Sequence, residues 1–146
     1  MSRRFLQDVL GIGYKYYHLK NKKKLPINNQ CSLRALVKVS GDEVNNVYKN
    51  LYKTAEKYND FPDNVTIIKK TAKKYYRMSG LNMDEYPLVA TFCSEHKMGS
   101  FIIFIQSHCF AYVNGVIYDS ISNGDKCTKE TIEWVLTQDI LDVIKK

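Results

Sequence analysis

The chain has 146 residues, of which 45% are hydrophobic and 12% aromatic, and its formal net charge is +7. This length suits one domain, and the apolar content excludes a disordered chain. No apolar run approaches the roughly 20 residues of a membrane-spanning helix, and the charged start MSRRFLQDVLGIG lacks the apolar region of a signal peptide. We therefore expect a cytoplasmic protein that has no membrane partner.

The four cysteines are far apart in the sequence and form no CxxC pair. In a chain without an evident secretion signal, this spacing predicts free thiols rather than disulfides. The cysteines are Cys31, Cys93, Cys109 and Cys127.

The first half of the chain has helical spacing of apolar residues. Residues 3–18 predict a first helix, and the polar, proline-containing stretch NKKKLPINNQ predicts an exposed loop. The apolar segment CSLRALVKV then predicts a helix that starts near Cys31. Ser40 and Glu43 have the spacing of a capping box for the next helix, which carries an apolar stripe and ends before Pro62. That stripe comprises Val44, Val47, Leu51, Ala55 and Tyr58.

Two more helices are predicted before the pattern changes. One runs from about Val65 to Arg77 with Asn64 as its cap, and a short one runs from about Leu88 to Glu95. The β-branched and aromatic runs SFIIFIQ, HCFAYV and GVIYDSI follow and predict three antiparallel strands.

The end of the chain, TKETIEWVLTQDILDVIKK, predicts a terminal helix over residues 128–146. The fold class is therefore α+β, in a single domain of residues 1–146. Its parts are an N-terminal helix and basic loop (1–27), a helical half (28–97), a β-meander (98–122) and the C-terminal helix (128–146).

The hairpin SHCFAYVNGVIYDS carries two titratable side chains. The pair Asn114-Gly115 favours a two-residue turn, and this turn sets Ala111 opposite Tyr118 in the neighbouring strand. In this register His108 and Asp119 are diagonal neighbours on one face, about 7–8 Å apart at the backbone. The carboxylate can then orient the imidazole, as in a catalytic triad.

A base with an orienting carboxylate requires a nucleophile, and Cys31 is the best-placed thiol. It follows a loop and begins a helical segment, where the backbone dipole lowers a thiol pKa. The amides of Asn29 and Gln30, or of Asn28, together with the backbone N–H of Cys31, could stabilise an oxyanion. Cys109 is expected on the face opposite His108, where it packs.

The segments NNQCSLRAL…GDEVNNVY and MGSFIIFIQSHCFAYVNGVIYDS resemble small papain-like cysteine peptidase domains of bacteriophages and bacteria. They are more distantly similar to the bacteriocin-processing peptidase domains of transporters. The likeness covers about residues 28–52 and 98–120. Gln30 departs from it, since the residue before the nucleophile is usually Asp, and position 25 is Leu where papain-like enzymes use an oxyanion Gln. The matching residues are Cys31, Arg34, Ala35, Leu36, His108, Asn114, Gly115, Tyr118 and Asp119.

The resemblance implies a papain-like fold and a phage-encoded cysteine hydrolase that acts on peptide, isopeptide or other amide bonds. Cys31 would be the nucleophile, His108 the general base and acid, and Asp119 the orienting residue. No metal or organic cofactor is required, and the partner is a protein or peptide substrate, acidic if charge complementarity governs the choice. The site of action would be the host cytoplasm or the virion.

Two other functions stay open. An inactive protein with the peptidase fold would bind a host or virion protein through its surface. A nucleic-acid-binding protein, which we favour less, would use a basic helix that also carries Tyr75 and Tyr76; a solvated basic face is the simpler interpretation. The basic residues of that helix are Lys69, Lys70, Lys73, Lys74 and Arg77.

Metal binding has weaker support. Cys93 and His96 have the spacing of half a zinc site, but no second half with suitable spacing follows. We therefore predict no metal site.

Overall fold

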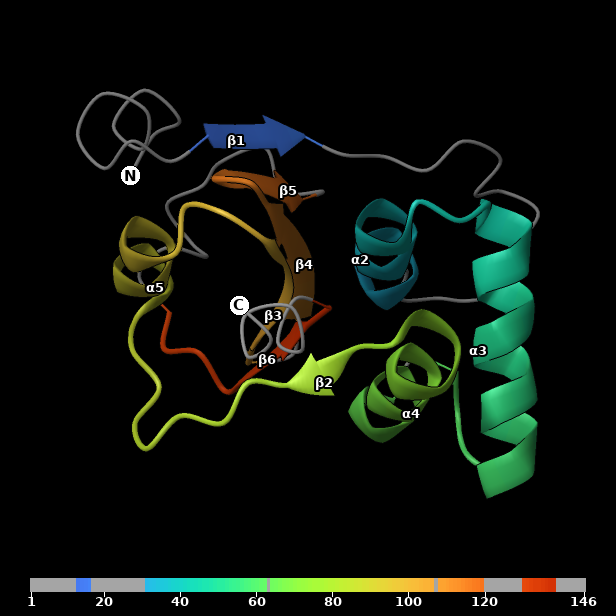
Figure 1. Ribbon diagram of the computed structural model, residues 1–146. Helices are drawn as coiled ribbons and strands as arrows, with labels where there is room; N and C mark the ends of the chain where they lie inside the picture. The colour runs from blue at the N-terminus through green and yellow to red at the C-terminus, as the bar shows by residue number, and fades with distance from the viewer. Residues whose placement is uncertain (1–12, 17–30, 63, 107, 120–129, 139–146) are drawn as a thin grey trace.

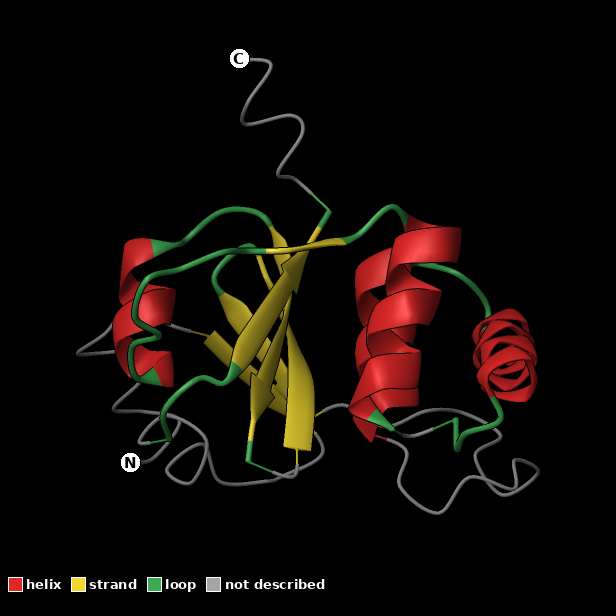
Figure 2. Ribbon diagram, turned by 90° about the horizontal axis from the view of Figure 1, so that it is seen from below, coloured by secondary structure: helices red, strands yellow, loops and turns green. Residues whose placement is uncertain are grey.

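The computed structural model describes residues 13–16, 31–62, 64–106, 108–119 and 130–138. In this part of the chain a mixed sheet lies between two layers of helices (Figures 1 and 2). The helices are α2 (Cys31–Ser40), α3 (Val44–Tyr58), α4 (Val65–Tyr76) and α5 (Val89–Glu95). The strands are β1 (Gly13–Tyr16), β2 (Ser79–Gly80), β3 (Ser100–Ile105), β4 (His108–Val113), β5 (Val116–Asp119) and β6 (Trp134–Thr137).

The strand order is β1-β5-β4-β3-β6-β2. All neighbouring pairs are antiparallel except β1 and β5, which run parallel at one edge. The α+β class is therefore confirmed. None of the helices in the described part is long and apolar enough to cross a membrane.

Each face of the sheet is covered by its own helices, as Figure 2 shows. On one face α2 packs directly against β4, and α3 and α4 complete that layer. On the other face α5 buries Phe92 against Phe110 and Tyr112 of β4. Because β4 is covered on both faces, its central residues are all buried, as is usual for an inner strand.

The sequence predicts the four helices well. Asn64 caps α4 as expected, because its side-chain oxygen accepts a hydrogen bond of 3.0 Å from the Thr66 backbone N–H. The capping box is wrong, since Glu43 makes no side-chain cap bond to α3. Ser40 instead ends α2 and accepts a hydrogen bond from the Asp42 backbone N–H.

The predicted N-terminal helix over residues 3–18 is wrong where the structure describes it. Residues Gly13–Tyr16 form β1, which pairs in parallel with β5. Gly13 disfavours a helix, and the two tyrosines of GYKY favour a strand. The free edge of β5 supplies the pairing partner that local sequence cannot reveal. The remaining residues of the predicted helix lie outside the described part.

The predicted terminal helix is wrong at residues Trp134–Thr137, which form β6 between β3 and β2. Val135 is buried toward α5, and Leu136 is buried toward α2 and α4. A strand buried on both faces has a continuous apolar run, which periodicity alone cannot distinguish from a buried helix. Residues 139–146 of the predicted helix lie outside the described part.

Candidate functional site

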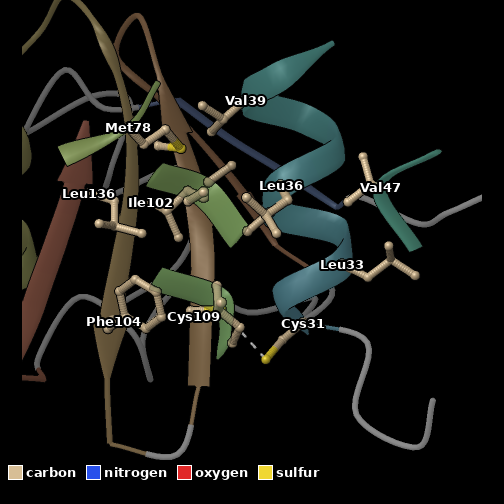
Figure 3. Close-up of a cluster of buried hydrophobic side chains, with 14 of the residues drawn as sticks. Cys31, Leu33, Leu36, Val39, Val47, Met78, Ile102, Phe104, Cys109 and Leu136 are labelled. Carbon is tan, nitrogen blue, oxygen red and sulfur yellow. Dashed lines mark hydrogen bonds between the residues drawn. The ribbon is translucent and has the colours of Figure 1, made fainter. Parts of the chain in front are cut away.

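The side chain of Cys31 lies where α2 meets the sheet. Cys31 is the first residue of α2 and is 7% exposed. Leu33 and Leu36 on the same helix are fully buried: Leu36 points toward Ile102 of β3, whereas Leu33 lies on the other side of α2, toward α3 (Figure 3). Because the opposing residues of β4 include the small Cys109 and Ala111, the helix can approach the strand closely.

Two side chains of β4 contact the Cys31 thiol. The Sγ atom of Cys109 lies 3.7 Å from the Sγ of Cys31 and donates a hydrogen bond to it (Figure 3). His108 also hydrogen-bonds to Cys31. Successive side chains of a strand point to opposite faces, so His108 and the next residue, Cys109, would not normally share a contact. His108 is the first residue of β4, at the end of the sheet, and its ring can therefore still reach the thiol.

These contacts change the acidity of the thiol. The Cys109 hydrogen bond is the largest influence and lowers the pKa of Cys31, while burial opposes it. The hydrogen bond and positive charge of His108 lower it further, and the resulting pKa is about 4 instead of 9. At neutral pH Cys31 is therefore a thiolate, the form in which cysteine acts as a nucleophile.

The thiol opens into a cavity of about 370 Å³, which we call the thiol cavity. Cys31, His108 and Cys109 line it together, and the indole of Trp134 forms part of its wall. The ammonium group of Lys69 lies 4.4 Å from the centre of that indole ring, within the range of a cation–π contact. The remaining lining residues are Val65, Ile68, Phe104, Ile105 and Glu133.

The predicted hairpin register is confirmed as far as the structure pairs its residues. Val113 faces Val116, Tyr112 faces Ile117 and Ala111 faces Tyr118. Asn114 has a φ of 47° and Gly115 a φ of 84°, as a tight Asn-Gly turn requires. Asp119 ends β5, and the structure describes its backbone but not its side chain. The contact between Asp119 and His108 therefore stays a prediction.

The predicted oxyanion residues, Asn29 and Gln30, lie outside the described part of the chain. The sequence interpretation missed two contributors to the site, Cys109 and Trp134. Cys109 was assigned to packing on the face opposite His108. The small side chains of Cys109 and Ala111 leave room for a closely packed helix, and this could have indicated that the helix of Cys31 packs on the Cys109 face of β4.

The predicted basic helix face is divided in the structure. Lys69 faces Trp134 and the thiol cavity, whereas Arg77 ends α4 in the left-handed conformation, with a φ of 54°. Lys70, Lys73 and Lys74 line a separate hollow between α4 and α3.

The possible half zinc site is accounted for by packing. Cys93 is buried, and the His96 ring stacks on Phe92 with 4.2 Å between the ring centres. Nδ1 of His96 lies 3.0 Å from the Phe92 carbonyl oxygen. Within the described ranges, no group of three or more His, Cys, Asp or Glu residues could hold a metal ion.

Comparison with known proteins found no matching family model, no matching curated protein and no matching solved structure. The papain-like resemblance therefore depends on the motifs of this chain alone.

Proposed function

We propose that this protein is a cysteine hydrolase of papain-like architecture, with Cys31 as nucleophile and His108 as general acid and base. One observation carries the proposal. Cys31 is the first residue of α2, and its thiol opens into a cavity large enough for a side chain. The thiol hydrogen-bonds to His108 and has a pKa of about 4. Structural cysteines are buried among apolar groups, which raise the thiol pKa. Reactive cysteines have a lowered pKa because a helix N-terminus or a positively charged side chain lies beside the thiol.

The proposed reaction is acyl transfer from an amide. The Cys31 thiolate attacks the carbonyl carbon, and the protonated His108 gives its proton to the leaving amine as the C–N bond breaks. Water then attacks the thioester while His108 accepts its proton. This second step releases a carboxylate and regenerates the Cys31–His108 pair.

Asp119 is the proposed orienting residue. The hairpin register pairs Ala111 with Tyr118, so Asp119 is one residue further toward the His108 end of β4. A carboxylate there can accept a hydrogen bond from the imidazole and fix the tautomer that the reaction needs.

The walls of the thiol cavity indicate the kind of substrate. Ile68, Phe104, Ile105 and Trp134 are apolar side chains around the reactive thiol. A pocket of this composition binds an aliphatic or aromatic side chain by burying its surface. We therefore propose a peptide or isopeptide substrate that has an apolar residue beside the cleaved bond.

The deciding experiment is the rate of Cys31 alkylation by iodoacetamide between pH 3 and 10, followed on the tryptic peptide of residues 25–34 by mass spectrometry. We expect thiolate reactivity at pH 6, and a midpoint that moves upward in His108→Ala because the thiolate loses its cationic partner. Cys93, buried on the other side of the sheet, serves as the internal control.

The same proteins are then assayed on fluorogenic peptides with an apolar residue at the cleaved bond. Cys31→Ala should abolish turnover, and Asp119→Asn should lower kcat more than it changes KM. An ordinary Cys31 pKa near 9 in the wild type would reject the hydrolase and favour an inactive binding protein with the same fold. Reactive Cys31 without turnover would restrict the error to the substrate class.

A further inference from the structure

A second concave surface, which shares no lining residue with the thiol cavity, is lined by residues of α3 and α4. These two helices lie side by side in the helical layer (Figure 1). We call this concave surface the lysine hollow. It has a volume of about 590 Å³. Its lining in the described part of the chain is Lys53, Thr54, Lys57, Tyr58, Lys70, Lys73, Lys74 and Tyr75.

The charge of the lysine hollow is one-sided. Five of its lining residues are lysines, two from α3 and three from α4, and no acidic residue of the described part lines it. The ammonium groups of Lys57 and Lys70 instead lie 5.5 and 4.3 Å from the centre of the Tyr58 ring. No ion pair of these lysines with a carboxylate is found within the described ranges, so their charges are available to an anion.

Concentrating five like charges in one hollow opposes folding by mutual repulsion, which an anion would relieve. Low-dielectric walls also focus the field, so the potential in a charged hollow exceeds that above a flat surface. An extended polyanion fits this arrangement better than a single phosphate does, because the charges extend along two helices.

The two tyrosines decide which polyanion is expected. Tyr58 is 46% exposed, and Tyr75 lines the same hollow, so aromatic rings accompany the cations. Tyr76, by contrast, packs against the core, and its hydroxyl donates to Asp42 and accepts from Asn50. Tyrosines beside lysines can stack on unpaired bases while the lysines contact phosphates, a combination typical of single-strand binding.

We propose that the lysine hollow binds single-stranded nucleic acid, with its lysines on the phosphates and with Tyr58 and Tyr75 on the bases. Duplex DNA keeps its bases stacked inside the helix, and an acidic peptide has no bases. Neither can use the two rings in this way. The proposal is independent of the hydrolase, since it involves no residue of the thiol cavity.

The test is fluorescence anisotropy of a fluorescein-labelled 20-nucleotide oligothymidylate at 50, 100 and 200 mM KCl. With four or five neutralised phosphates, log K should fall with log salt at a slope of about −3, which is about 60-fold between the end points. A 20-base-pair duplex and polyglutamate should bind at least tenfold more weakly. Equal binding of either one would overturn the proposal.

Variants then locate the site. The triple variant Lys57→Ala, Lys70→Ala and Lys73→Ala should reduce the slope by about 2 and the affinity by roughly tenfold or more. The control removes the same three charges elsewhere, as Lys38→Ala, Lys49→Ala and Lys97→Ala. Equal losses in the two triple variants would show a general charge effect and reject the hollow as the site.

The tyrosines are tested separately, because base stacking adds to the binding affinity without releasing counterions from the phosphates. Tyr58→Leu together with Tyr75→Leu should lower the affinity by about 30-fold or more and leave the salt slope unchanged. An unchanged affinity would contradict the assignment to single strands. Circular dichroism melting of each variant establishes that it folds, and Lys→Gln versions provide a second set if an alanine variant does not.

Discussion

The contact between Cys31 and Cys109 is the feature that most changes the chemistry of this chain. A thiolate in an apolar cavity would normally be unfavourable, because burial raises the pKa of a thiol. Here an S–H donor at 3.7 Å and the imidazole of His108 together outweigh the cost of burial. In the proposed hydrolase, Cys109 therefore acts through Cys31, as a positioning residue and not as a second nucleophile.

Removing this donor gives a direct prediction. Cys109→Ala should raise the Cys31 pKa from about 4 toward the ordinary thiol value, because its largest lowering contact is lost while burial remains. The measurement is the pH profile of Cys31 alkylation by iodoacetamide. Cys109→Ser, which restores a hydrogen-bond donor, should keep the pKa closer to that of the wild type.

Cys93→Ala is the matched control, since it also removes a buried thiol from the core but on the α5 side of the sheet. If Cys109→Ala and Cys93→Ala have the same small effect on the Cys31 profile, the Cys109 hydrogen bond is not what acidifies the thiol.

Packing between β2 and β6 controls the wall of the thiol cavity. β2 pairs with β6, and a Cβ atom placed on Gly80 would clash with the Cζ2 atom of the Trp134 indole. Glycine is therefore required by close approach here. The indole that it accommodates also lines the thiol cavity and contacts Lys69.

Gly80→Ala should consequently disturb both stability and the site. We expect the free energy of unfolding to fall by about 1–3 kcal/mol, the usual cost of overpacking. Trp134 is the chain's single tryptophan, so its fluorescence spectrum should shift at the same time. Urea unfolding followed by tryptophan fluorescence measures both quantities. Ser79→Ala, on the same strand, should change neither, and equal effects of the two variants would contradict the clash.

The ionisation of Cys31 also affects the stability of the complete fold. The pKa of Cys31 is lowered on folding, from about 9 to about 4, so the unfolded chain binds more protons between these values. The contribution of the Cys31 ionisation to the free energy of unfolding is fully present above pH 9. It decreases as the pH falls and is lost at about pH 4. Stability from this source therefore rises with pH across this window.

Comparison of wild type with Cys31→Ala isolates that contribution. The difference in free energy of unfolding, wild type minus variant, should increase from pH 5 to pH 8, whatever its constant offset from lost packing. Urea unfolding at pH 5, 6, 7 and 8 gives this difference. A value that does not change with pH would contradict a lowered Cys31 pKa in the folded protein.

Local patterns were sufficient for much of this molecule. The helical spacing in residues 31–95 and the Asn-Gly turn predicted α2 to α5 and the β4–β5 register, because these depend on neighbouring residues. The same patterns also predicted that Cys31 and His108 would be partners. Predicting that α2 packs on the Cys109 face would have needed one more inference, from the small side chains of that face.

Tertiary structure decided the rest. β1 and β6 become strands because they pair with β5 and β3, which are distant in the sequence. The lysine hollow requires α3 and α4 side by side, since Lys53 and Lys57 are far from Lys70 along the chain. The acidity of Cys31 likewise depends on a thiol 78 residues away. The sequence by itself determined α2 to α5, the β4–β5 hairpin and the types of titratable residue, whereas long-range pairing determined β1, β6 and the neighbours of Cys31, because hydrogen bonding and electrostatics depend on distance in space.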